Sequence, residues 1–363
     1  MAGRRPTNTF QVTAAGPGSG DGVGAQPTRA TPEGNEFARA TQPFRRELLA
    51  HCYRMLGSVD EAQDLVQETY LRAWRAYDRF EGRSSMRVWL YQIATNACLN
   101  ALAHRSRRVL PSGLGGPSDD PDGEASLAGP DVRWIEPLPT ALVTPESEDP
   151  STIAAINASI RLALIASLQL LPARQRAVLI LRDGLDLPAA EVAQMLAIST
   201  VAVKSALQRA RARLEQGSPQ IDELTEPSEP EARALLDRYI AAFEQGDLVA
   251  LEQILRDDAT LEMTASSTWF AGKRNCLRFI TRFLGSPDLY RMIPTAASGQ
   301  PAAAAYRRAE NGTYQAFALV VLTTTPTAIA RIALFNDPRS FATFDLPATQ
   351  PSDKRRALDD AFN

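Results

Sequence analysis

Eight prolines within residues 111–150 constrain this chain more than any other feature, because neither a long helix nor a central strand can pass through them. Apolar residues recur at helical spacing on both sides of this stretch. Runs of β-type residues, such as TYQAFALVVLTT, follow only toward the C-terminus. We therefore expect a multidomain protein: two all-α domains, a linker between them, and then an α+β domain.

Changes in composition also predict where the segments begin and end. The first residues are rich in Gly, Pro, Thr and Ala, which is typical of a disordered tail. We expect this tail at 1–35, helical domains at 36–108 and 152–216, an acidic linker at 109–151, a hinge at 217–230, an α+β domain at 231–346 and a second tail at 347–363.

The net charge of −3 hides a strong segregation of charge along the chain. Five arginines lie within residues 81–108, against the single acid Glu81. Residues 200–216 carry four basic side chains against Glu215 alone, whereas 111–152 carry nine acids and only Arg133. Basic blocks separated by an acidic one are compatible with nucleic-acid binding despite an isoelectric point of about 5.7.

The cysteines and histidines are few and scattered. Cys52, Cys98 and Cys276 are odd in number, which argues against a disulfide framework, and His51 and His104 are too few for a metal enzyme. No apolar run approaches the roughly 20 residues of a membrane span, and the N-terminus lacks the apolar core of a signal peptide. We expect a cytoplasmic protein with no cofactor, no metal and no membrane association.

Residues 58–77 form an amphipathic helix in which Ser58 is the expected N-cap. The apolar stripe runs from Val66 to Tyr77 at helical spacing. The residues that fall largely on the other side are Asp60, Asp64, Gln67, Glu68 and Leu71. An exposed acidic row of this kind is usually a solvated face.

The next helix, at about 85–104, carries polar residues where solubility alone does not require them. Gln92, Asn96 and Asn100 repeat every four residues, and amide side chains can read base edges. Trp89 and Tyr91 can stack on unpaired bases, and the following arginines, beginning with Arg105, can hold phosphates.

The second helical domain contains a helix-turn-helix pattern. The helix PAAEVAQML is followed by the turn AIS and by a basic helix that Ser199 or Thr200 can cap. The second helix of such a unit enters the major groove of DNA. The residues that we expect to face DNA are Ser199, Thr200, Val201, Lys204, Ser205, Gln208, Arg209 and Arg211.

These segments together resemble one protein family. EAQDLVQETYLRAWR followed by WLYQIATNACLN resembles region 2 of the extracytoplasmic-function (ECF) sigma factors. LPARQRAVLILRD followed by AEVAQMLAIS and VKSALQRARARL resembles region 4 of the same family, except that Ala202 stands where many members have Thr. The resemblance implies that region 2 binds core RNA polymerase and the −10 element, and that region 4 binds the −35 element and the β flap.

The resemblance also implies individual roles, and it changes the acidic row from a solvated face to a partner-binding one. Residues implied at the β′ clamp helices are Asp60, Asp64, Leu65, Val66, Gln67 and Glu68. Residues implied at the melted −10 strand are Arg79, Arg83, Ser84, Trp89, Gln92, Asn96, Asn100 and Arg105. The linker is either a flexible tether or, as in the family, a segment that threads the polymerase cleft, where its acids mimic RNA.

The last domain resembles the SnoaL-like branch of the NTF2 fold, a curved sheet around helices that forms a cone. Tyr239, Glu262, Trp269 and Tyr314 are candidates to line a pocket in that cone, or they simply pack the core. Relatives that are enzymes pair Asp with His or Tyr, and this domain has no histidine, so we do not expect catalysis. The resemblance to sigma factors with the same C-terminal domain implies regulation in cis. Whether the cone binds a small ligand, and whether a separate anti-sigma factor exists, is left open by the sequence.

Two other classes of protein fit parts of the sequence. A repressor or activator with a ligand-sensing domain would use the helix-turn-helix alone and bind palindromic duplex DNA. An NTF2-like enzyme with a DNA-binding leader would need acid and base residues that we do not find. Only an alternative sigma factor accounts for both the DLVQE helix and the helix with Asn96 and Asn100.

Overall fold

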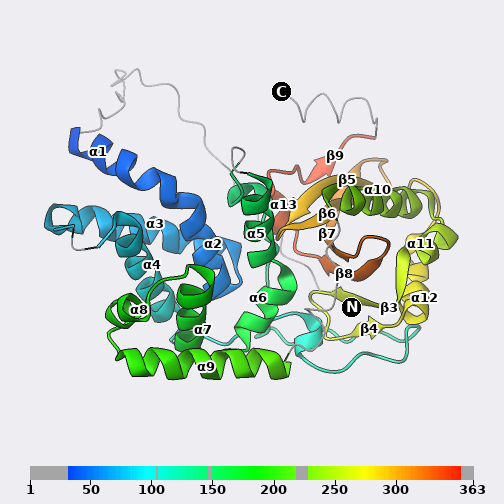
Figure 1. Cartoon of the computed structure of the whole chain (residues 1–363). Helices are drawn as coiled ribbons and strands as arrows, with labels where there is room; N and C mark the ends of the chain where they lie inside the picture. The colour runs from blue at the N-terminus through cyan, green and yellow to red at the C-terminus, as the bar shows by residue number, and fades with distance from the viewer. Residues whose placement is uncertain (1–31, 83, 104, 146–148, 218–227, 353–363) are drawn as a thin grey trace, which may run out of the picture.

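The computed structural model describes residues 32–82, 84–103, 105–145, 149–217 and 228–352 (Figure 1). The predicted hinge and both predicted tails therefore lie mostly outside the described residues. Helix α1 begins at Pro32, inside the segment expected to be disordered, because Phe37 packs edge-on against Trp74 and Tyr77. Strand β9 likewise extends the last domain to Gln350, beyond its expected end at 346.

The first helical domain is held together by residues that start and stop its helices. Gly57, with a φ of 69°, ends α2 in the left-handed conformation that glycine adopts without strain. The side chains of Ser58 and Ser85 cap α3 and α4 by accepting backbone N–H groups. The helices are α1 (Pro32–Thr41), α2 (Arg45–Leu56), α3 (Val59–Ala76) and α4 (Met86–Leu102).

The described residues of the linker form little regular structure, as its prolines require. Strands β1 (Arg108–Val109) and β2 (Arg133–Trp134) pair in parallel, and 3-10 turns lie at Pro111–Gly113 and Thr140–Leu142. The second helical domain follows with α5 (Pro150–Ser159), α6 (Leu162–Gln169), α7 (Ala173–Leu179), a π-helical turn at Ile180–Gly184, α8 (Ala189–Leu196) and α9 (Thr200–Gly217).

The last domain is a mixed sheet with three helices on one face and a short fourth helix on the other, which confirms the expected α+β class. Its strands lie in the order β4-β3-β8-β7-β6-β5, with β9 beside β7, and only β3 and β8 pair in parallel. The elements are α10 (Glu229–Gln245), α11 (Leu248–Ile254), β3 (Leu255–Met263), β4 (Trp269–Ala271), α12 (Lys273–Leu284), β5 (Tyr290–Ala297), β6 (Gln300–Arg308), β7 (Tyr314–Thr324), β8 (Ile329–Phe335), α13 (Arg339–Thr343) and β9 (Thr349–Gln350).

The two faces of this sheet belong to different hydrophobic cores. Along β7, Val320 and Leu322 pack with the helices α10–α12, whereas Leu319 and Val321 point the other way. That second face joins a core that also contains both helical domains and the linker. In Figure 1, α5 and α6 stand between the first helical domain and the sheet. The C-terminal domain is thus packed onto the helical domains.

Candidate partner and nucleic-acid interfaces

Helix α3 presents most of its predicted binding row to the outside. Asp60, Asp64 and Gln67 are exposed, whereas Glu68 is half-buried and pairs with Arg72 at 2.6 Å. Leu65 is also half-buried. Val66 lies on the apolar stripe of the helix and is buried in the domain core, so it is not accessible to a partner in this conformation.

The outer surface of α3 also carries large apolar side chains. Leu71 is 56% exposed and Trp74 is 40% exposed, which is unusual for residues of this size. Leu71 continues the row of Asp64 and Gln67 at helical spacing, on the face where the periodicity of the sequence predicts it. The result is a mixed acidic and apolar surface, the composition that suits a protein partner.

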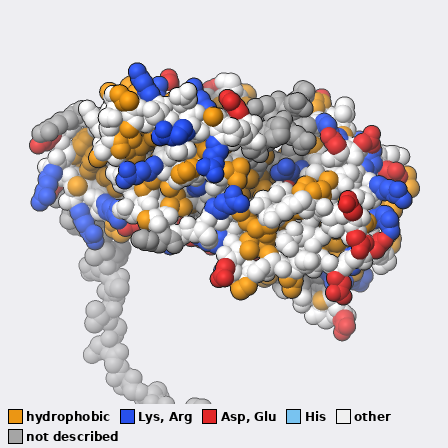
Figure 2. Space-filling view, turned by 90° about the horizontal axis from the view of Figure 1, so that it is seen from below, with side chains coloured by type: hydrophobic (Ala, Val, Ile, Leu, Met, Phe, Trp, Pro, Cys, Tyr) orange, Lys and Arg blue, Asp and Glu red, His pale blue; other side chains and the backbone are white. Residues whose placement is uncertain are grey.

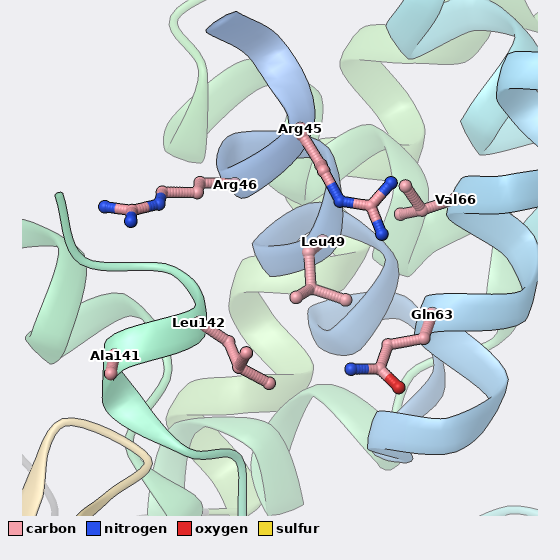
Figure 3. A pocket seen from close by; sticks show the side chains of 7 residues that line it. All are labelled: Arg45, Arg46, Leu49, Gln63, Val66, Ala141 and Leu142. Carbon is pink, nitrogen blue, oxygen red and sulfur yellow. The ribbon is translucent and has the colours of Figure 1, made fainter. Parts of the chain in front are cut away.

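A cavity of about 220 Å³ lies between α2, α3 and the linker turn Thr140–Leu142 (Figure 3). Its floor is apolar, with Leu49 and Leu142 facing each other across it, and the Arg45 guanidinium lies near Val66 at its rim. Arg46 points away from it and donates a hydrogen bond to the Thr144 carbonyl oxygen at 3.0 Å. The linker thus rests against the helix pair that carries the acidic row.

Helix α4 is partly covered by the second helical domain. Asn100 is exposed, but Gln92 and Asn96 are half-buried, and the Asn96 amide nitrogen donates to the Met195 carbonyl oxygen of α8 at 3.5 Å. Trp89 is half-buried against Phe80, with ring centroids 4.7 Å apart. One of the predicted DNA-reading residues is therefore engaged inside the molecule.

The remaining candidates around α4 divide into free and engaged side chains. Arg79 and Ser84 are exposed, and Arg83 lies outside the described residues. Arg105 is exposed but pairs with Glu61 at 2.7 Å. Tyr91 is buried, and its hydroxyl donates to the Glu47 carboxylate at 3.1 Å, so it offers no stacking surface in this conformation.

Helices α8 and α9 form the predicted helix-turn-helix, with a bend of 99° between them. The Ser199 hydroxyl accepts a hydrogen bond from the Ala202 backbone N–H at 3.1 Å and so caps α9. The exposed candidates are Ser199, Thr200, Val201, Lys204, Gln208, Arg209 and Arg211. Ser205 is half-buried, and Arg211 pairs with Asp183 of the π-helical turn at 2.7 Å.

Helix α9 lies along one edge of the molecule (Figure 1). On the face that carries this helix, Lys and Arg side chains gather over the helical part, and acidic side chains gather over the opposite end (Figure 2). A basic surface around a helix-turn-helix is the electrostatic pattern of a DNA-binding face.

The two helical domains are joined by a buried arginine that the sequence did not single out. Arg176 of α7 donates to the Met55 carbonyl oxygen at the end of α2, and also to the Gln169 side chain at 2.6 Å. Gln169 in turn donates to the Arg54 carbonyl oxygen at 3.5 Å. Burial lowers the pKa of Arg176 to about 10. The second domain therefore satisfies carbonyl groups at the C-terminus of a helix of the first.

The four candidates for a cone pocket do not meet in one cavity, which corrects that expectation. Tyr239 is buried among the helices on one face of the sheet. Glu262 and Trp269 are neighbours on the other face, because β3 alternates and Leu261 takes the helical side. Tyr314 also lies on that face, where its hydroxyl donates to the Asp288 carbonyl oxygen at 2.9 Å.

The linker covers Glu262 and Trp269. The Glu262 side chain is almost fully buried, at 2% exposure, and accepts a hydrogen bond from the Ser112 backbone N–H at 3.0 Å. The Trp269 indole donates to the Gly115 carbonyl oxygen at 2.8 Å. These two residues bind the chain itself in place of a ligand.

Two further properties bear on function. Among the described residues, no group of three or more His, Cys, Asp or Glu side chains is placed to hold a metal ion. No single helix in the described part of the chain is long and apolar enough to cross a membrane, and two bent helix pairs meet that test on length and composition alone.

Comparison with known proteins follows the same division of the chain. The family model for sigma-70 region 2 matches residues 41–108, and the model for sigma-70 region 4 matches residues 161–214. The ECF RNA polymerase sigma factor SigG of Mycobacterium tuberculosis is 49% identical over 315 residues, covering 86% of this chain and 84% of that protein. SigJ of the same species is 28% identical over 220 residues, covering 60% and 62%.

A solved structure shares this fold over most of the chain. The crystal structure of M. tuberculosis SigJ aligns with a TM-score of 0.54 at 20% identity, covering 86% of this chain and 99% of that one. This likeness shows the fold: helical sigma domains followed by an α+β domain.

The helix-turn-helix, the α3–α4 domain and these matches define a sigma-70-type transcription factor. More narrowly, the chain belongs to the ECF RNA polymerase sigma factors. It is an alternative sigma factor that directs transcription initiation by RNA polymerase core on promoter DNA, and it is not an enzyme.

Proposed function

We propose that the C-terminal domain regulates this sigma factor in cis by holding the linker away from RNA polymerase. The observation that carries the proposal is the path of the linker over that domain. Besides the contacts at Ser112 and Gly115, Asp122 pairs with Arg278 of α12, and Arg282 donates to the Pro121 and Gly123 carbonyl oxygens at 3.0 and 2.6 Å. A linker bound in this way is not free to thread the polymerase cleft.

The packing of the helical domains supports the same proposal. Asn96 is hydrogen-bonded to α8, and Arg176 closes the end of α2, so the domains lie against each other. Simultaneous contact with the −10 and −35 elements requires them to separate. We infer a closed free form and an open form that RNA polymerase and promoter DNA select.

We further propose how the open form divides its contacts. The exposed row of α3 from Asp60 to Leu71 binds the β′ clamp helices, and α4 with Arg79 and Ser84 binds the melted −10 strand. The exposed residues of α9 bind the −35 element, and the second helical domain contacts the β flap. In this assignment, region 2 spans 36–108, region 4 spans 152–216, the regulatory domain begins near 231, and the protein acts in the cytoplasm.

The test is run-off transcription from promoter DNA with core polymerase and the full chain carrying Arg278→Ala and Arg282→Ala. If α12 holds the linker, this double variant opens more readily and yields several-fold more transcript than the unaltered chain. Arg274→Ala is the matched control, because Arg274 is exposed on the same helix one turn earlier. Equal transcript from all three proteins would rule out regulation through the linker.

A further inference from the structure

The tight turn between β5 and β6 lies where the C-terminal domain meets the rest of the chain. Ala297 and Ser298 are fully buried, although turns at the ends of hairpins are normally at the surface. Ser298 and Gly299 have φ values of 52° and 68°, the combination of a two-residue hairpin turn. A buried turn with a non-glycine residue in this conformation indicates a constrained contact.

The turn is held by hydrogen-bonding groups from both helical domains and the linker, and we call this set of groups the seat. On the linker side, the Ser298 N–H donates to the Leu138 carbonyl oxygen at 2.6 Å, and the Leu138 N–H donates back to the Ser298 hydroxyl at 3.0 Å. The Gly299 N–H donates to the Thr140 hydroxyl at 3.0 Å, and Ala297 forms a β-bridge with Pro139.

The two helical domains complete the seat. From α2, the Tyr53 hydroxyl lies 3.2 Å from the Ser298 hydroxyl and also donates to the Glu136 carbonyl oxygen at 2.7 Å. From α6, the Leu162 backbone N–H donates to the Gln300 side chain at 3.1 Å. One turn therefore touches the first domain, the linker and the second domain at once.

Gly299 is required for two reasons: its φ is positive, and a side chain at this position would not fit. A Cβ atom added there would lie 2.3 Å from the Asn157 carbonyl oxygen of α5, a distance that no side chain can occupy without moving backbone. The seat is therefore shaped for a turn that carries no side chain at this position.

We propose that the β5–β6 turn, residues 297–300, is the wedge through which the C-terminal domain locks the two helical domains and the linker together. The effect of this wedge on transcription rests on the proposed regulation in cis. Its role as the docking element is a separate claim, and it can be tested without polymerase.

The test uses the full chain with Gly299→Ala, and Gly312→Ala as control. Gly312, in the turn between β6 and β7, has a φ of 83°, and an added Cβ would meet no atom of the described chain within 4 Å. Both variants place alanine at a left-handed position, but only Gly299→Ala collides with α5. Hydrogen exchange is then followed at the Leu138 and Leu162 amides, which donate to the turn.

We expect exchange at these two amides to accelerate at least about tenfold in Gly299→Ala and to stay within about twofold of the unaltered chain in Gly312→Ala. Amides in the pairing of β6 with β7 should stay protected, which shows that the sheet remains folded. Equal exchange at Leu138 and Leu162 in the two variants would overturn the proposal.

A second variant covers the case in which Gly299→Ala unfolds the sheet. Tyr53→Phe removes one hydroxyl from the helical side of the seat and leaves the C-terminal domain unaltered. Faster exchange at Leu138 supports the wedge, and unchanged exchange refutes it. If exchange at Leu138 and Leu162 accelerates but run-off transcription does not change, the proposed regulation in cis is refuted and the docking role of the turn is supported.

Discussion

His51 should make the stability of the first helical domain depend on pH. Its ring is fully buried between α2 and α4, where Nε2 lies 2.9 Å from the Thr95 hydroxyl and the Tyr91 ring stands edge-on at 5.0 Å. The pKa of His51 falls from its ordinary 6.5 to about 3, mainly because burial disfavours the imidazolium and also because the Arg54 guanidinium repels it.

The size of the effect follows from proton linkage. The folded protein keeps His51 neutral, whereas the unfolded chain binds a proton at this residue below pH 6.5. The stabilisation that the neutral His51 provides is therefore fully present above that pH, and the free energy of unfolding decreases as the pH falls below it. At about 1.4 kcal/mol per pH unit, the free energy of unfolding should drop by about 2 kcal/mol between pH 7 and pH 5. That loss is a large fraction of the stability of an ordinary domain.

Urea unfolding at the two pH values measures this loss, with His51→Gln as the reference. Glutamine retains an amide that can reach Thr95 but does not titrate. The difference in free energy of unfolding between pH 5 and pH 7 should therefore be smaller by about 2 kcal/mol in His51→Gln than in the unaltered chain. The imidazole pKa of His51 can also be read directly by NMR. The reasoning is refuted if His51→Gln loses as much stability as the unaltered chain, or if the measured pKa is above about 6.

Three further perturbations test separate surfaces. Asp64→Arg should abolish binding to core polymerase without unfolding the chain, since Asp64 is exposed, and a pull-down with Asp237→Arg as control checks this. Glu136→Ala removes the carboxylate that accepts from Ser58 and Val59 at the start of α3 and should cost about 1–2 kcal/mol in urea unfolding, whereas Glu124→Ala should cost nothing measurable. Lys204→Ala should weaken holoenzyme binding to all promoters and lower the slope of log affinity against log salt by about 0.9, and an unchanged slope would remove Lys204 from the phosphate contacts.

Local patterns predicted the helices and their exposed faces well. The positions of Asp64, Gln67 and Leu71 follow from the 3.6-residue period of α3, because a helix that buries Val66 and Ala73 must turn these residues outward. The helix-turn-helix was equally visible, since its cap at Ser199 and its spacing are local features. These were also the motifs that carried the family resemblance.

The position of the linker could not be predicted from local sequence patterns. Its prolines excluded helix and central strand correctly, but nothing in its composition told a free tether from a docked segment. Glu136 is one of the acids that would mimic RNA if the linker threaded the polymerase cleft, and in the closed form it caps α3 and pairs with Arg108 at 2.8 Å. Its partners lie far away in the sequence, so composition could not identify them.

What the sequence alone determined is the set of elements and the class of protein, because helical period, caps and turn residues act over a few positions. What only the tertiary structure decided is which surfaces are already occupied. Glu262 and Trp269 face the linker, Arg176 closes α2, and Gly299 fits under α5, each through contacts between residues far apart in the chain. Such pairings depend on how whole domains come together, and no periodicity in the sequence records them.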